Sequence, residues 1–273
     1  MHFSLHPEEL DSIHKRFVYE EFFYSQLLWA RHKRFHAQDV KGIRFENRRD
    51  LTSRLYRELP FKLTQAQKRV INEIFGDMCS DRQMSRLLQG DVGSGKTLVA
   101  LMCMLIAIDN GYQACLMAPT EILASQHYQT ILKLLGDIGL EVDLLTGSST
   151  KKVRRDIDEK LRGGTLNILI GTHALIEENV RFRNLGLVII DEQHRFGVAQ
   201  RAKLWEKSPD PPHVLVMTAT PIPRTLAMTV YGDLDVSVID ELPPGRIPVK
   251  TMHFTEPERN KVFGFIRNQI STG

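Results

Sequence analysis

Residues 90–97 have the sequence GDVGSGKT, which fits the pattern G-x-x-x-x-G-K-[ST]. The apolar pair Leu87 and Leu88 precedes this stretch and a helix-forming run follows it, as the pattern requires. Glycines let backbone N–H groups wrap around phosphate oxygens, and the amino terminus of the following helix adds positive potential. The stretch therefore predicts a loop that binds a nucleoside triphosphate.

The parts of this loop have distinct expected roles. We expect Lys96 to reach the β- and γ-phosphates and the Thr97 hydroxyl to bind Mg²⁺. The other members of the nucleotide-binding set form the cradle, and they are Gly90, Asp91, Val92, Gly93, Ser94 and Gly95. The alternative is a glycine-rich turn that binds nothing, and the strand–loop–helix context argues against it.

Short apolar runs alternate with helical patterns around the loop. The predicted strands cover residues 86–89, 114–118, 142–146, 168–171, 187–191 and 214–218. The pieces between them are long enough for crossover helices, so we expect an α/β fold with a mostly parallel, doubly wound sheet. Helices are expected over 7–37 and from Thr64, which has capping-box spacing to Gln67. Residues 38–60 are expected to form an irregular connector.

Polar side chains follow two of these strands, where parallel sheets collect their ligands. Asp191 and Glu192 end the strand over 187–191, and we expect Asp191 to bind Mg²⁺ and Glu192 to activate water. Thr218 and Thr220 follow the next strand and are expected to couple the acidic pair to the rest of the domain. Helix capping by Thr220, with Pro221 after it, is a compatible alternative.

The series of motifs resembles superfamily 2 helicases, and among them the RecG family of bacterial ATP-dependent DNA helicases of replication-fork repair and recombination. The shared motifs are GDVGSGKT, APTEILA (118–124), LTGS (145–148), GTHAL (171–175), DEQHRFG (191–197) and TATPIPRTLA (218–227). The last two also occur in the transcription-repair coupling factor. GDLDVSVIDELPPGR (232–246) and RFVYEEFFYSQLLWARHKRF (16–35) resemble the RecG family.

The resemblance implies a RecA-like P-loop NTPase fold, ATP and Mg²⁺ as cofactors, and branched or fork DNA as the partner. It implies that Phe61 and Gln67 recognise adenine, although the capping-box role of Gln67 stays open. The residues implied to couple the sites are Gln193, His194, Thr218, Thr220 and Arg224. The residues implied to contact DNA are Pro119, Thr120, Thr146, Gly147, Thr172 and His173. Helix capping is the alternative for the stretches 119–121 and 171–173.

The resemblance also gives the expected domains. These are a linker helix and basic connector (1–60), a first motor lobe (61–247) and the start of a truncated second motor domain (248–273). A complete relative carries a wedge domain before residue 1 and a second RecA-like lobe after about residue 250, so we expect this chain to be a fragment. Arginine fingers of the second lobe are worth roughly 10³–10⁵ in turnover, so weak hydrolysis by the lobe alone is expected.

Composition narrows the class of protein. The chain has 273 residues, 25% of them charged, and its longest apolar run, 98–108, is too short for a membrane span. The start of the sequence lacks a signal-peptide pattern, and the cysteines form no C-x-x-C, so we expect a cytoplasmic monomer that contacts no membrane. Nine basic residues against three acidic ones between Arg31 and Arg57 favour a solvated helix surface, with a DNA-proximal or interdomain surface as the alternative.

Two other functions remain open at the level of sequence. One is a translocase like the transcription-repair coupling factor. The other is a nucleotide-binding interaction module that never turns over, against which the complete set of Lys96, Thr97, Asp191 and Glu192 argues.

Overall fold

The computed structural model describes residues 7–39, 42–177, 179–191, 207–208, 210–220, 234–241 and 251–271. The chain divides into two compact units, Met1–Pro243 and Pro244–Gly273. The division lies inside residues 242–245, the Leu-Pro-Pro-Gly stretch that breaks the alternating pattern.

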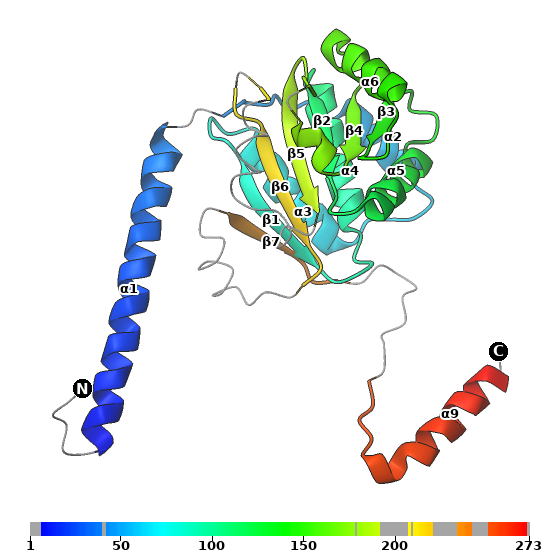
Figure 1. Ribbon diagram of the computed structural model, residues 1–273. Coiled ribbons are helices and arrows are strands. Elements are labelled where there is room, and N and C mark those ends of the chain that lie inside the picture. The colour runs from blue at the N-terminus through cyan, green and yellow to red at the C-terminus, as the bar shows by residue number, and fades with distance from the viewer. Residues whose placement is uncertain are drawn as a thin grey trace. The chain divides into compact units, whose positions relative to one another are not determined.

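Seven parallel strands form a single sheet in the first unit (Figure 1), in the order β3-β4-β2-β5-β6-β1-β7. Their bounds are β1 Ser85–Gly90, β2 Gln113–Met117, β3 Val142–Leu145, β4 Ile168–Gly171, β5 Leu185–Asp191, β6 His213–Thr218 and β7 Asp235–Ile239. The predicted α/β fold with a parallel sheet is confirmed. Strand β7 is not among the predicted strands, because it is a short edge strand that is only partly buried.

Helices cover both faces of this sheet (Figure 1). Alternate strand residues point to opposite faces, so Leu116 and Ile189 join one core and Met117 and Ile190 the other. The first face is covered by α3 (Gln65–Met78), α4 (Lys96–Asp109) and α5 (Glu121–Leu135). The second face is covered by α6 (Lys151–Gly163) and the 3₁₀ helix η1 (His173–Ile176). This is the double winding that the sequence predicts.

Helix α4 is the central helix of the fold. Its residues 98–107 are all buried, because the sheet lies on one side and α2 (Asp50–Glu58), α3 and α5 contact it on the others. An apolar run of this kind is typical of a helix that is enclosed on every side. The helix that follows the phosphate-binding loop is therefore held firmly, and so is its amino terminus.

The expectation of an irregular connector over residues 38–60 is wrong in part. A helix, α2 (Asp50–Glu58), lies there and buries Leu55 against α4. Ile43 and Phe45 are also buried in the core on the first face. Their burial extends that core upstream of residue 61, where the predicted motor lobe begins. Helix α2 was not predicted because it is only nine residues long and mostly polar, with Leu51 and Leu55 as its only aliphatic residues.

The two ends of the chain also carry helices. The helix predicted over 7–37 is confirmed as α1 (Pro7–Asp39). In the second unit, η3 (Glu256–Glu258) runs into α9 (Arg259–Ser271), as expected for that region. Beyond the Leu-Pro-Pro-Gly stretch the sequence predicts a strand over 249–254 followed by a helix over 256–270. The strand prediction is wrong for its described part, because residues 251–254 are in no strand. None of the described helices combines the length and apolar character that crossing a bilayer requires.

Candidate nucleotide-binding site

The phosphate-binding loop and Asp191 lie at the same edge of the sheet. Strand β6 separates β1 from β5, with Gln89 of β1 in register with Thr218 of β6. On its other side, β6 places Met217 in register with Asp191 of β5. Since neighbouring strands lie about 4.8 Å apart, the loop and Asp191 flank the end of β6 at close range. We call the ends of β1, β6 and β5 the near half of this edge.

The loop itself has the backbone that binding of phosphate requires. Gly93 and Gly95 adopt positive φ angles of 79° and 88°, where a side chain would be strained. Gly95 is the N-cap of α4, and no side chain of the described residues caps that terminus. The Lys96 Nζ donates to the carbonyl oxygens of Gly90 and Asp91, at 2.7 and 3.0 Å. The lysine therefore lies across the mouth of its own loop.

Gln67 ties α3 to this loop. Its side-chain oxygen accepts from Thr64 N at 2.9 Å, which confirms the capping box. Its Nε2 donates to Ser94 O at 2.8 Å, and a Cβ at Gly95 would lie 2.3 Å from that nitrogen. Phe61, four residues before Gln65, has a side chain that is 49% exposed and thus available to stack on a base. The role of both residues in recognising adenine stays a prediction.

The residues present fit a nucleoside triphosphate with Mg²⁺. The Ser94 hydroxyl is buried in the loop and has no hydrogen-bond partner among the described residues. A buried polar group without a partner is costly, and a bound phosphate oxygen or water satisfies it. The Thr97 hydroxyl and the Asp191 carboxylate offer oxygen ligands, which Mg²⁺ prefers. Asp191 is 8% exposed, so water competes little for its carboxylate.

Asp191 has a partner that the sequence analysis missed. The His127 Nε2 on α5 lies 2.7 Å from Asp191 Oδ2, and the two side chains are 13% and 11% exposed. The signal in the sequence is a polar residue on an apolar stripe, since His127 follows buried Ala124 by three residues and precedes buried Ile131 by four.

Thr218 and Thr220 bond each other. Their hydroxyls lie 2.8 Å apart, and Thr220 N donates to Thr218 Oγ1 at 3.2 Å. Within the described part of the chain neither hydroxyl bonds Asp191. The expected coupling to the acidic pair is therefore not a direct hydrogen bond to Asp191, and it stays a prediction for the rest of that motif. Glu192, Gln193, His194 and Arg224 lie outside the described residues.

The predicted DNA-contacting residues gather at the ends of β2, β4 and β3, which we call the far half of the edge. Thr120 is the N-cap of α5 and accepts from Leu123 N at 3.2 Å, so its capping role is confirmed, and Pro119 precedes it, half-buried. Gly147 and His173 are exposed. Thr146 and Thr172 are buried. Contact of these six residues with DNA stays a prediction.

Two side chains that the sequence analysis missed hold the far half together. Glu121, the first residue of α5, accepts from Ser148 N at 3.0 Å and from Ser148 Oγ at 2.9 Å. The hydroxyl of Ser148 thereby lowers the pKa of the Glu121 carboxyl. Arg154 of α6 donates to the carbonyls of Thr146 and Ser149, at 2.9 and 3.1 Å. Loop 146–149 is therefore fixed from both sides.

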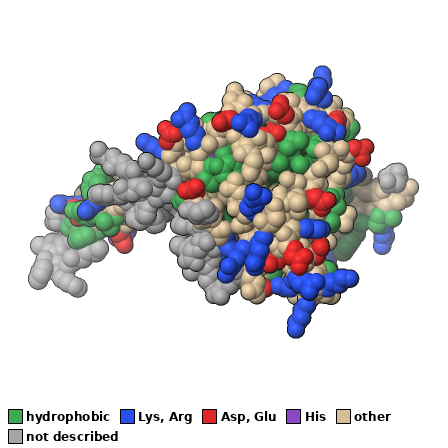
Figure 2. Space-filling view, turned by 90° about the horizontal axis from the view of Figure 1, so that it is seen from above, with side chains coloured by type: hydrophobic (Ala, Val, Ile, Leu, Met, Phe, Trp, Pro, Cys, Tyr) green, Lys and Arg blue, Asp and Glu red, His purple; other side chains and the backbone are tan. Residues whose placement is uncertain are grey.

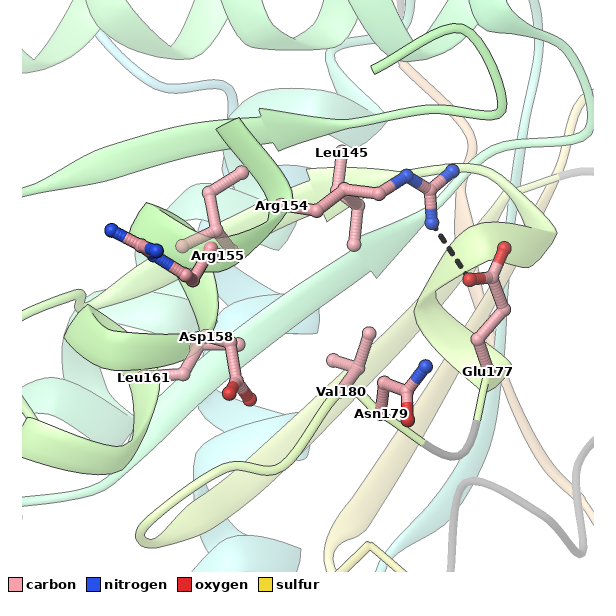
Figure 3. A pocket seen from close by; sticks show the side chains of 9 residues that line it. Leu145, Arg154, Arg155, Asp158, Leu161, Glu177, Asn179 and Val180 are labelled. Atoms are coloured by element: carbon pink, nitrogen blue, oxygen red, sulfur yellow. Dashed lines mark hydrogen bonds and ion pairs between the residues drawn. The ribbon is translucent and has the colours of Figure 1, made fainter. Parts of the chain in front are cut away.

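Arg154 also bounds a small cavity. Figure 3 shows its guanidinium directed at the Glu177 carboxylate, which lies 2.7 Å away. The cavity measures about 170 Å³, and apolar side chains from β3 and α6 form part of its lining. Both residues line the cavity, and their ion pair joins α6 to the segment that follows η1.

The structured part of the basic stretch is paired locally. Arg44, Arg48 and Arg54 form ion pairs with Asp81, Glu46 and Glu58, all of them exposed. Basic and acidic side chains are likewise interspersed on the face seen in Figure 2. Residues 46 and 51 bond Asn110 and Asp109 at the carboxyl end of α4, the end opposite the phosphate-binding loop. The solvated-surface interpretation is favoured for this part of the stretch.

Comparison with known proteins identifies close relatives. The family model of the DEAD/DEAH box helicases matches residues 64–229. The ATP-dependent DNA helicase RecG of Synechocystis sp. is 51% identical over 273 residues, which are 100% of this chain and 33% of the relative. RecG of Bacillus subtilis is 48% identical over 273 residues, 100% of this chain and 40% of the relative. The chain thus spans only a third to two fifths of the length of these relatives.

Solved structures of helicases are similar to this chain as well. The structure of RecG bound to a three-way DNA junction superposes with a TM-score of 0.84 at 44% identity, over 97% of this chain and 35% of that one. Helicase MrfA bound to DNA superposes with a TM-score of 0.56 at 17% identity, over 83% of this chain and 36% of that one, which shows a shared fold.

The helicase model covers more than half of the chain, including the phosphate-binding loop and the strand that ends at Asp191. The sheet order and the register around β6 give the geometry that these motifs require. The chain therefore belongs to the DEAD/DEAH box helicase family, and its resemblance to the RecG helicases within that family is confirmed.

Proposed function

We propose that this chain is the ATP-binding lobe of an ATP-dependent DNA helicase or translocase motor that remodels branched DNA. The observation that carries the proposal is the phosphate-binding loop beside Asp191 at one edge of the sheet, with the far-half loops along the same edge. Relatives named as RecG helicases, one of them solved on a three-way DNA junction, support branched DNA as the substrate.

The near half supports a mechanism for hydrolysis. The amides of the loop and Lys96 bind the phosphates and oppose the charge that develops on the γ-phosphate. Thr97 and Asp191 hold Mg²⁺, which when bound neutralises phosphate charge. Glu192 accepts a proton from the attacking water. Phe61 and Gln67 hold the adenine base, so that the triphosphate enters the loop in one orientation.

The far half supports contact with the sugar–phosphate backbone. The exposed residues 147 and 173 and the amino terminus of α5 suit phosphate oxygens, because helix termini present N–H groups. Binding of this kind is nearly independent of sequence and weakens steeply with salt. Gln193, His194, Thr218, Thr220 and Arg224 relay the nucleotide state toward the second lobe. We also propose that the protein acts as a monomer in the cytoplasm.

The first experiment tests nucleotide binding by the chain itself. A fluorescent ATP analogue is titrated with and without Mg²⁺, and binding that Mg²⁺ tightens is the expected result. The chain is then joined to a second motor lobe, and phosphate release is measured with and without branched DNA. We expect DNA to stimulate release and Glu192→Gln to abolish it, since the variant lacks the proton acceptor.

Two outcomes would contradict the proposal. Release that DNA does not stimulate and that Glu192→Gln does not change favours a nucleotide-binding interaction module. A chain that binds no analogue, with or without Mg²⁺, removes nucleotide binding altogether.

A further inference from the structure

The pair of His127 and Asp191 lies between the two halves of the edge. Asp191 ends β5, while His127 is in the second turn of α5, the helix that begins in the far half. Their 2.7 Å contact is nearly enclosed, with both side chains under one seventh exposed. An ionised carboxylate only accepts hydrogen bonds, so the His127 Nε2 carries the hydrogen and donates it.

The contact fixes how the carboxylate is turned. Alternation along β5 directs the Asp191 side chain to the face that α4 and α5 cover, since Leu187 and Ile189 point there. His127 engages Oδ2, which leaves Oδ1 as the oxygen for a metal ion or its water. Without the imidazole the carboxylate is free to rotate about its own bonds. Partners of ligating carboxylates typically change metal affinity by 10–100-fold when removed.

Helix α5 connects the His127 contact with the far half. Its first residue, Glu121, accepts two hydrogen bonds from Ser148, and its N-cap is Thr120. His127 follows Glu121 by six residues, about 9 Å along the helix axis. Buried Ala124, Ile131 and Leu135 pack the helix on the sheet, so the segment between the two contacts moves as one piece.

We propose that His127 is a positioning residue that sets the orientation of the Asp191 carboxylate for Mg²⁺ and links it, through α5, to loop 146–149. The proposal rests on the proposed function, in which Asp191 holds Mg²⁺. No described side chain other than His127 bonds Asp191, so a single substitution breaks the link.

The decisive measurement is the Mg²⁺ concentration at half-maximal binding of a fluorescent ATP analogue to the 273-residue chain. We expect His127→Ala to raise this midpoint about tenfold and to leave binding without Mg²⁺ unchanged. His127→Gln, which returns an N–H donor at similar reach, restores most of the loss. Gln129→Ala, on the exposed side of the same helix, leaves the midpoint at the wild-type value.

The outcomes separate the inference from the proposed function. A wild-type chain without Mg²⁺-dependent binding contradicts the proposed function. If the wild-type chain shows Mg²⁺-dependent binding and His127→Ala has the same Mg²⁺ midpoint, the inference is overturned and the proposed function stands. If His127→Ala also weakens binding of the analogue without Mg²⁺, and His127→Gln shows the same loss, the substitutions have disturbed the fold. That outcome also overturns the inference.

Hydrogen exchange tests the link through α5. In the wild-type chain, saturating Mg²⁺ and analogue should slow amide exchange in loop 146–149, because Asp191 then holds α5 through His127. In His127→Ala, measured at its own saturating Mg²⁺, the slowing should disappear. Equal slowing in the two proteins overturns the link.

Discussion

The near and far halves of the sheet edge are built in different ways. The near half takes its shape largely from backbone, namely two left-handed glycines, the start of α4 and the register of β1, β6 and β5, and the side chains of Gln67 and His127 add one hydrogen bond each. The far half depends on side chains distant in sequence, with Glu121 and Ser148 27 residues apart and Arg154 and Glu177 23 apart. A local backbone motif is visible in a sequence, whereas a network of distant side chains is not.

The largest expected effect is that of Lys96→Ala. Removing the ammonium takes away the charge opposite the γ-phosphate, so phosphate release in the two-lobe protein should fall about 10²–10³-fold. DNA affinity should stay unchanged, because the far half does not use Lys96. Lys133→Ala, an exposed lysine in the last turn of α5, is the matched control. A comparable loss of DNA affinity in Lys96→Ala would show that the far half also depends on Lys96.

The second prediction concerns the end of β6 that is remote from the near half. Burial lowers the pKa of His213 to about 4. Below about pH 6.5 the His213 imidazole is protonated in the unfolded chain but stays neutral in the folded chain. Unfolding is therefore increasingly favoured as the pH falls. The free energy of unfolding keeps its full value above pH 6.5, and it falls by up to about 3 kcal/mol between pH 6.5 and pH 4.

Urea unfolding between pH 4 and 7 measures this loss. His213→Asn keeps an acceptor for Met84 N, which donates to His213 Nδ1 at 2.9 Å. The variant should show a flatter dependence on pH. Equal slopes in the two proteins would mean that His213 does not govern the acid side of the stability curve.

Arg154→Gln should impair the far half and spare the near half, whereas Lys96→Ala should do the reverse. The substitution removes the donors that hold the carbonyls of loop 146–149, so DNA affinity at low salt should fall about tenfold. Nucleotide affinity should not change. Arg155→Gln, whose partner is the exposed Glu159 one turn along α6, is the control. DNA affinity that survives Arg154→Gln would mean that the loop keeps its shape without the arginine.

The smallest expected effect is at Gln67. Loss of its hydrogen bond to Ser94 O should weaken nucleotide binding about 3- to 10-fold in Gln67→Ala. If Gln67 also contacts adenine, the affinity for ATP falls more than that for GTP. Equal losses for the two nucleotides would assign Gln67 to holding the loop alone. Competition titrations against one fluorescent analogue measure both.

Prediction from sequence succeeded where the determinants are local. The six strands and the capping box at Thr64 follow from periodicity and spacing, and the structure has them within a few residues. Helix α2 and strand β7 were missed, because Leu55 is the only buried residue of α2 and β7 is a partly exposed edge. The charge of the basic stretch left a DNA-proximal surface open as an alternative, and Arg44 finds its acidic partner, Asp81, only in the fold.

The sequence by itself determined the phosphate-binding loop, the parallel α/β fold and the family, because each depends on residues close together in the chain. Only the tertiary structure decided that Asp191 is held by His127 and loop 146–149 by Glu121 and Arg154. These contacts join residues 8 to 64 positions apart. No periodicity or spacing encodes such a contact, since it exists only after the sheet order has brought the strand ends together.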